Sequence, residues 1–205
     1  MRRQDVIVLN IGGDQHFQKS INAVEWLLSS HSVSVPRPRT QFVTATDLQL
    51  VTETTLIPCT LMHVMGHGDR QGGIGGSRQS KMFWVENLIP YCENDNNEWF
   101  PDVDVLLLDA CSTFSPSWMR SLGALQPRAH EMLFIGTTRA VTWHEATTYA
   151  SAFYSAIVYP AFPRNRTARQ RRAAAQVAHE KASLAFLAVL GKPSPFRSTT
   201  VASTR

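Results

Sequence analysis

A cysteine and a histidine stand at the ends of two apolar stretches of the chain. Cys111 follows the run Val103–Ala110, and His67 follows the run Leu61–Gly66. A cysteine attacks well only as a thiolate, and a nearby imidazole provides the base or ion-pair partner that forms a thiolate near neutral pH. The two residues are therefore a candidate nucleophile and base, provided that the fold brings them together.

Both apolar runs are too short for helices and rich in Val and Leu, which is typical of fully buried parallel strands. In open α/β sheets, ligands bind outside the carboxyl ends of such strands. Two neighbouring strand ends would place His67 and Cys111 close together. The backbone N–H groups of Gly68 and Cys111 could then bind an oxyanion, and Gly68 would let a substrate backbone approach closely.

The rest of the chain alternates between further strand and helix patterns. We predict strands at Asp5–Ile11, Gln41–Ala45 and Met132–Thr137, and helices at His16–Ser30, Pro116–Leu125, Glu145–Val158 and Thr167–Leu190. This alternation predicts a three-layer α/β fold with a mainly parallel central sheet flanked by helices. We expect one domain over residues 1–193 and a flexible Ser/Thr/Pro-rich tail over residues 194–205.

Three segments are less regular in sequence. Asp47–Leu56 is compatible with a short helix or a loop, and Trp84–Cys92 with a short helix. Asp69–Lys81 contains four glycines and is expected to be a mobile loop. Because Arg70 and Arg78 flank these glycines, self-processing of this loop is a further hypothesis.

Composition limits the class of protein and its compartment. The chain has 205 residues, 43% hydrophobic and 18% charged, which is typical of a globular protein. Its three cysteines, Cys59, Cys92 and Cys111, form no C-x-x-C pair, so we expect free thiols and a cytoplasmic location. The run Val6–Leu9 is too short for a secretion signal, and no apolar run of about 18 residues predicts a membrane span.

The residue pairs at the two strand ends resemble the signature of the caspase-like cysteine peptidases. His67-Gly68 and Ala110-Cys111 each follow hydrophobic residues, as in that group. With His63, the first pair is similar to the His-x-x-x-His-Gly pattern of CHAT-domain peptidases. Ala110-Cys111-Ser112-Thr113 is similar to their Ala-Cys-x-Thr.

The resemblance extends along most of the chain, from about Asp5 to Ile157. The segment Gly136–Trp143 is similar to the caspase segment that reaches Ser-Trp-Arg, and the helix with Ala152-Phe153-Tyr154 also has a counterpart there. The resemblance implies the caspase-hemoglobinase-like fold and a cysteine endopeptidase of the caspase, metacaspase or CHAT type.

The resemblance also implies residue roles. His67 would be the general base and acid, and Cys111 the nucleophile that forms a thioester. The amides of Gly68 and Cys111 would hold the oxyanion. No cofactor is implied. No metal is expected, because no cysteine or carboxylate completes a zinc set with His63 and His67. The implied partners are a protein or peptide substrate and a sensor or adaptor module, in cell-death or defence signalling.

The substrate pocket is expected to involve Asp109, Trp143, His144 and Glu145. Metacaspases carry an acid beside the S1 pocket at the position of Asp109, which favours Arg or Lys at P1. The alternative is that Asp109 caps or pairs locally. Glu145 would add negative charge, and Trp143 would line S2 or belong to the core. His144 stands where caspases have arginine, so cleavage after Asp is not expected.

Two other functions remain open from the sequence. The chain could be a catalytically silent caspase-like scaffold that binds a protein partner. It could also be a doubly wound nucleotide- or flavin-binding protein, which would need phosphate contacts at Gly12-Gly13. The basic cluster of five arginines between residues 164 and 172 is interpreted as a solvated helix face, so nucleic acid is not an expected partner.

Overall fold

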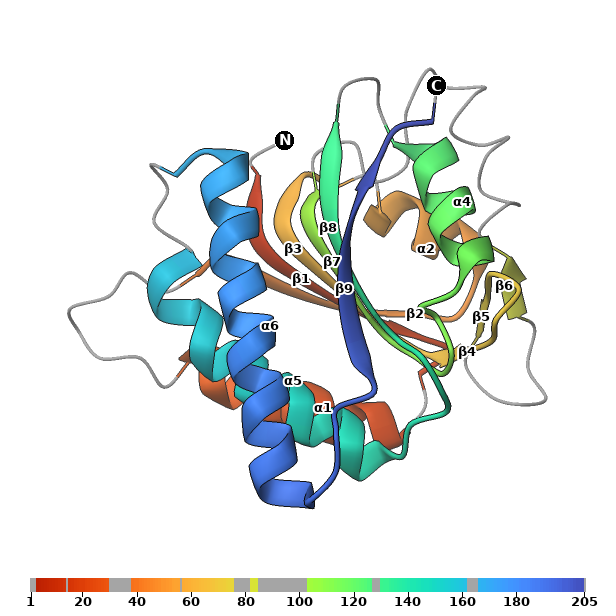
Figure 1. The fold of residues 1–205 in the computed structure, drawn as a ribbon. Coiled ribbons are helices and arrows are strands. Elements are labelled where there is room, and N and C mark those ends of the chain that lie inside the picture. The colour runs from red at the N-terminus through yellow and green to blue at the C-terminus, as the bar shows by residue number, and fades with distance from the viewer. Residues whose placement is uncertain are drawn as a thin grey trace.

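A six-stranded sheet forms the centre of the structure, a computed structural model that describes residues 3–13, 15–29, 38–55, 57–75, 82–84, 103–126, 130–161 and 166–204. The strand order is β2-β1-β3-β7-β8-β9 (Figure 1). The first five strands are parallel, and β9 joins β8 antiparallel at the edge. The strands of this sheet are β1 (Gln4–Ile11), β2 (Thr40–Ala45), β3 (Cys59–Met65), β7 (Val103–Asp109), β8 (Glu131–Thr137) and β9 (Phe196–Ala202).

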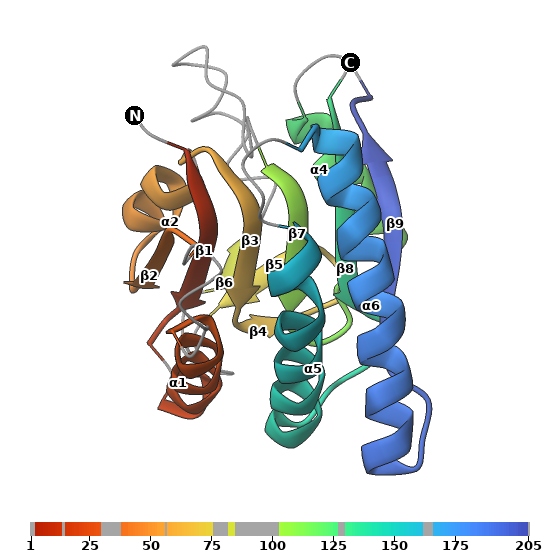
Figure 2. The same ribbon diagram turned by 90° about the vertical axis from the view of Figure 1, so that its left-hand side faces the viewer.

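Helices cover both faces of the sheet. The described helices are α1 (Gln15–Ser29), α2 (Leu48–Thr55), α4 (Pro116–Leu125), α5 (Trp143–Ala161) and α6 (Ala168–Leu190). Helices α1, α5 and α6 lie on one face, and α2 and α4 on the other (Figures 1 and 2). Every residue of β3 and β7 is buried, because central strands of a parallel sheet are covered on both faces. The expected three-layer α/β fold class is confirmed.

Local capping explains where the predicted helices begin and end. Helix α4 has Pro116 at its first turn, and the Ser115 side chain accepts a hydrogen bond from the Trp118 amide. Helix α6 begins with a capping box of Thr167 and Gln170 and ends at Gly191, whose φ is 66°. The segment Asp47–Leu56, for which helix and loop were both open, contains helix α2.

Residues 194–205, for which we expected a flexible tail, include strand β9 of the central sheet. Strand β9 pairs with β8 over its whole length, from Thr137↔Phe196 to Glu131↔Ala202. The Phe196 ring stacks on Tyr149 with centroids 3.7 Å apart, and Val201 is also buried. The Ser/Thr-rich composition resembled a tail, but threonine is β-branched and suits an edge strand.

The described part of the glycine-rich loop contains a short strand. This strand, β5 (Gly73–Gly75), pairs antiparallel with β4 (His67–Gly68) before the loop and with β6 (Met82–Trp84) after it. The Asp69 carboxylate accepts hydrogen bonds from the Gln71 and Gly73 amides, which closes the turn between β4 and β5. Apart from Trp84, the helix expected over Trp84–Cys92 lies outside the described residues. Arg78 does too, so self-processing of this loop stays a prediction.

Two arginines of the basic cluster at the start of α6 form ion pairs with other elements of the protein. The Arg171 Nε lies 2.6 Å from the buried Asp104 carboxylate, and Arg172 lies 2.8 Å from Glu131. These ion pairs attach α6 to the first residues of β7 and β8. No described helix is both long and apolar enough to cross a membrane.

Candidate active site

The register of β3 and β7 brings the histidine and the cysteine to the same edge of the sheet. The last registered pair is Met65↔Asp109, and the Gly66 amide donates to the Asp109 carbonyl at 3.4 Å. His67 and Cys111 each lie two residues beyond that pair. Strands β3 and β7 are therefore neighbours with aligned ends, as the sequence predicted for the segments that carry His67 and Cys111.

Gly68 allows the two strand ends to touch. A Cβ atom at this position would lie 2.8 Å from the Cys111 carbonyl oxygen, 2.9 Å from the Ala110 Cβ and 3.0 Å from the Thr113 Cγ2. No side chain fits there without moving the cysteine turn. We expected this glycine to admit a substrate backbone, but the space beside its Cα is filled by the turn that carries Cys111.

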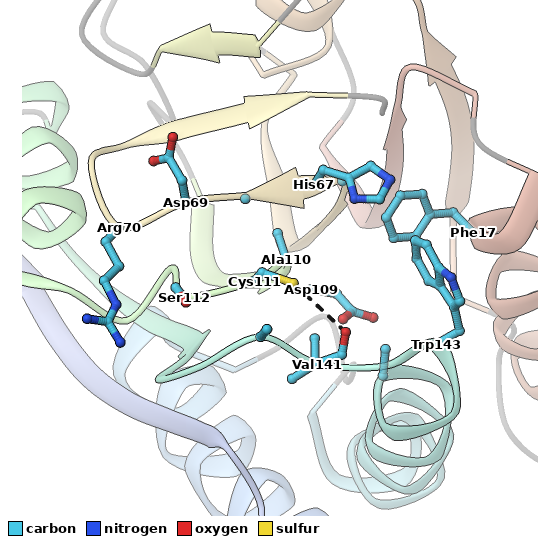
Figure 3. A pocket seen from close by; sticks show the side chains of 14 residues that line it. Phe17, His67, Asp69, Arg70, Asp109, Ala110, Cys111, Ser112, Val141 and Trp143 are labelled. Atoms are coloured by element: carbon cyan, nitrogen blue, oxygen red, sulfur yellow. Dashed lines mark hydrogen bonds between the residues drawn. The ribbon is translucent and has the colours of Figure 1, made fainter. Parts of the chain in front are cut away.

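The turn after β7 is sharp and presents Cys111 at the surface of a pocket. Ser112 has a φ of 58°, in the left-handed region that costs a non-glycine residue about 1 kcal/mol. Its amide donates to the Arg139 carbonyl at 3.1 Å. The Cys111 thiol, which is half-buried, donates to the Val141 carbonyl at 3.8 Å (Figure 3).

Two buried threonines hold this turn in place. The Ala110 carbonyl accepts hydrogen bonds from the Thr137 hydroxyl at 2.5 Å and the Thr113 hydroxyl at 3.2 Å. The Thr113 hydroxyl in turn accepts from the Thr137 amide at 3.1 Å. The threonine of the Ala-Cys-x-Thr pattern thus fixes the backbone beside the cysteine, and Thr137 extends that support to strand β8.

Aromatic rings surround the His67 imidazole. Its centroid lies 5.7 Å from that of Phe17 and 5.6 Å from that of Trp143, both in edge-to-face geometry. His16 stacks on Trp143 with an interplanar angle of 13°. Trp143 therefore both contacts His67 and packs against the core, so the two interpretations given for it, pocket wall and core residue, are compatible.

These residues line one pocket of about 870 Å³. Its walls are formed by Phe17, residues 66–70, residues 109–112, Ala140, Val141, Trp143 and Ala146. Figure 3 shows the rings of His67, Phe17 and Trp143 grouped at one end, with Asp69 and Arg70 at the other. Five of the residues singled out from the sequence meet here: His67, Gly68, Asp109, Cys111 and Trp143.

Asp109 is the unusual member of this pocket. Its side chain is 2% exposed, yet neither carboxylate oxygen has a hydrogen-bond partner among the described residues. The His63 Nε2 lies 3.7 Å from Oδ2, which is within ion-pair range but too long for a hydrogen bond. The local contact of Asp109 is therefore with His63, and it leaves both carboxylate oxygens without a hydrogen bond from the described residues.

Glu145 does not add charge to the pocket, contrary to expectation. Its carboxylate lies 2.7 Å from Arg139 and 2.9 Å from Lys192, and it accepts a hydrogen bond from the Thr142 amide at 2.8 Å. The hydrogen bonds from Arg139 lower the pKa of Glu145 well below its ordinary value of 4.5, while burial opposes this shift. His144 is exposed and is also absent from the pocket wall.

Sequence reasoning missed several pocket and support residues. Phe17 lies in the predicted helix His16–Ser30, and Val141 lies in the segment Gly136–Trp143, but neither was predicted to line the site. His63 was predicted only as part of the His-x-x-x-His-Gly pattern and was rejected as a metal ligand. It is fully buried, and its Nδ1 lies 3.2 Å from the Tyr154 hydroxyl. The signal for His63 was its place two residues from Met65 in an apolar strand, where a polar side chain must find a buried partner.

The described part of the chain contains no group of three or more His, Cys, Asp or Glu side chains that could hold a metal ion. Cys59 and Cys111 are free thiols. Cys59 is fully buried, whereas Cys111 lines the pocket. Of these two cysteines, Cys111 is the one that a substrate can reach.

The fold is similar to that of a known cysteine protease. A search of solved structures matches a secreted C11 cysteine protease from Bacteroides thetaiotaomicron, named iotapain, with a TM-score of 0.51 and 9% sequence identity. The match covers 82% of this chain and 64% of the neighbour's chain. No model of a known protein family and no curated protein sequence matches the chain. At this identity the likeness shows a shared fold.

Proposed function

We propose that this protein is a caspase-like cysteine endopeptidase that uses His67 and Cys111 as a catalytic dyad. The observation that carries the proposal is the meeting of the two side chains in one pocket, two residues beyond the same registered pair of β3 and β7. The fold shared with a C11 cysteine protease supports the class of chemistry.

The proposed reaction is acyl transfer through a thioester. His67 takes the thiol proton of Cys111, and the thiolate attacks the carbonyl carbon of the scissile bond. His67 then gives that proton to the leaving amine as the C–N bond breaks. Water attacks the thioester with His67 as base, which releases the new carboxyl end and restores the thiol. The first step requires the thiol to exchange its contact with the Val141 carbonyl for one with His67.

The proposed substrates are proteins or peptides with Arg or Lys at P1. Asp109 supports this choice, because its buried carboxylate lines the pocket and accepts no hydrogen bond from the described residues. A guanidinium or ammonium group would supply both the donors and the opposite charge. The backbone N–H groups of Gly68 and Cys111 are proposed to hold the oxyanion.

We propose that the protein acts in cell-death or defence signalling with a sensor or adaptor module as a partner, which the family resemblance implies. We also propose a cytoplasmic location, because the cysteine spacing indicates free thiols.

Hydrolysis of fluorogenic peptides that differ only at P1 tests the proposal. We expect cleavage after Arg and Lys, far less after Ala or Asp, and loss of cleavage to background in Cys111→Ala and His67→Ala. Cys59→Ala is the matched control, because Cys59 is buried away from the pocket, and it should retain activity. A folded wild-type protein that cleaves none of these peptides would instead favour the silent-scaffold alternative.

A further inference from the structure

A second layer of polar side chains lies directly beneath the pocket floor. His63 on β3, Asp109 on β7 and Tyr154 on α5 come together there, each no more than 2% exposed. The His63 imidazole stands between the other two, with Nδ1 3.2 Å from the Tyr154 hydroxyl and Nε2 3.7 Å from the Asp109 Oδ2. Neither the proposed reaction nor the core packing accounts for an imidazole at this place.

The polar atoms of His63 and Asp109 that face one another in this layer lack hydrogen bonds within the described part of the chain. His63 Nε2 and both Asp109 oxygens lack hydrogen-bond partners among the described residues. A buried carboxylate without a donor is costly, and a proton on the adjacent imidazole would reduce that cost. A cation that enters the pocket would reduce the same cost of burying the Asp109 charge, from the pocket side instead of from the His63 side.

The other titratable groups around this layer are few. Helix α5 contributes Tyr149 and Tyr154, and burial raises the pKa of both phenols well above 10, so both keep their protons. Helix α6 contributes His179, which is hydrogen-bonded to Tyr149 at 2.5 Å. Burial lowers the pKa of His179. Strand β3 also contributes Cys59, and β1 contributes the buried, uncharged Asn10 amide beside its apolar side chains. Strand β8 and helix α1 contribute apolar side chains.

We propose that His63 is a specificity-determining residue that holds a proton against Asp109 until a cationic substrate side chain replaces it. This inference rests on the proposed function, since it concerns the P1 preference of the same site. With the pocket empty or occupied by a neutral side chain, the His63–Asp109 pair is formally neutral. When Arg or Lys enters, one positive charge arrives beside Asp109 and one proton leaves His63 for solvent.

The proton balance makes the selectivity depend on pH. Below the midpoint pH of this exchange, a basic substrate must displace a proton. The ratio of its kcat/KM to that of a neutral isostere therefore falls about tenfold for each unit by which the pH decreases. Above the midpoint the ratio is constant.

The experiment compares two peptide substrates that differ only in Arg or citrulline at P1, between pH 5 and 9. Citrulline has the shape of arginine without the charge. Titration of His67 and Cys111 affects both substrates alike and cancels in the ratio of their kcat/KM values. We expect this ratio to rise about tenfold or more with pH and then to level off. A ratio that is flat with pH in the wild type would overturn the proposal.

Two variants test whether the proton that leaves on binding of a basic substrate resides on His63. In His63→Gln, which can still accept from Tyr154, the pH change of the ratio should disappear or shift its midpoint by more than about one unit. Tyr154→Phe is the matched control, because it removes the contact to Nδ1 but leaves the imidazole beside Asp109, and the change should remain. An unaltered midpoint in His63→Gln would place the proton elsewhere and contradict the role of His63.

A binding measurement keeps the test independent of the folding of those variants. Calorimetry of Cys111→Ala with an Arg peptide, in buffers of different ionisation enthalpy, should show release of about one proton below the midpoint, and the citrulline peptide none. Binding of the Arg peptide without proton release would refute the exchange while leaving the endopeptidase proposal intact. If the wild type hydrolyses neither substrate, the proposed function itself fails.

Discussion

Strand β7 buries one aspartate near each end, and the two carboxylates are satisfied in opposite ways. Asp104, near the start of the strand, lies 2.7 Å from Arg3 and 2.6 Å from Arg171. Asp109, at the end of the strand, has no hydrogen-bond partner among the described residues and lines the pocket. Both side chains are no more than 2% exposed. The two carboxylates are equally buried, but only Asp104 has arginine partners at hydrogen-bond distance in the described part of the chain. This difference separates a structural carboxylate from one that is available to a ligand.

Of the two aspartates, Asp109 should have the larger effect on catalysis when it is replaced by asparagine. Removing this charge should lower kcat/KM for Arg substrates by about a hundredfold or more, because a buried charge pair with the substrate is lost. The melting temperature should change little, because neither Asp109 oxygen accepts a hydrogen bond from a described residue that the substitution would break. Kinetics and thermal unfolding of the same preparation check both parts. An unstable variant with unchanged selectivity would make Asp109 structural.

Asp104→Asn should have the opposite signature. The variant leaves Arg171 without its carboxylate at a largely buried site, and we expect a loss of about 2 to 3 kcal/mol in the free energy of unfolding. The ratio of Arg to citrulline cleavage should not change, because Asp104 lies at the far end of the strand. Urea unfolding measures the first quantity. A changed P1 preference would break the distinction between the two aspartates.

Glu145→Gln should give a smaller effect that depends on pH. The Arg139, Lys192 and Thr142 contacts favour the ionised form, so the folded-state pKa lies below the unfolded one. The stability that Glu145 contributes is therefore present above about pH 4.5 and is lost as the pH falls below that value. We expect the variant to be about 2 kcal/mol less stable at pH 7, with a smaller difference at pH 3. An equal difference at both pH values would contradict this assignment.

The sequence predicted the elements whose signals are local. The apolar run Val103–Ala110 contains strand β7 over Val103–Asp109, and the helix predicted over Pro116–Leu125 has those bounds. Strand β9 was missed because its pairing with β8 depends on tertiary contacts such as the stack of Phe196 on Tyr149. Only two of its residues are large and apolar.

The site was predicted in part for the same reason. His67 and Cys111 were found because each ends an apolar strand. The partnership of His63 with Asp109 depends on the register of two strands whose paired residues lie 44 apart in sequence, which composition does not reveal. Glu145 had a local signal that was overlooked: Thr142-x-x-Glu145 is a capping-box pattern, and each of the two side chains does bond the other's amide.

The most direct test of the dyad is to find which atom an activity-based probe modifies. The wild-type protein is treated with a peptidyl acyloxymethyl ketone that carries Arg at P1, and the adduct is located by peptide mass spectrometry. The account predicts one adduct, on Cys111, that is absent in Cys111→Ala and blocked by excess Arg substrate. Modification of Cys59 or Cys92 instead, or no adduct on folded wild-type protein, would contradict it.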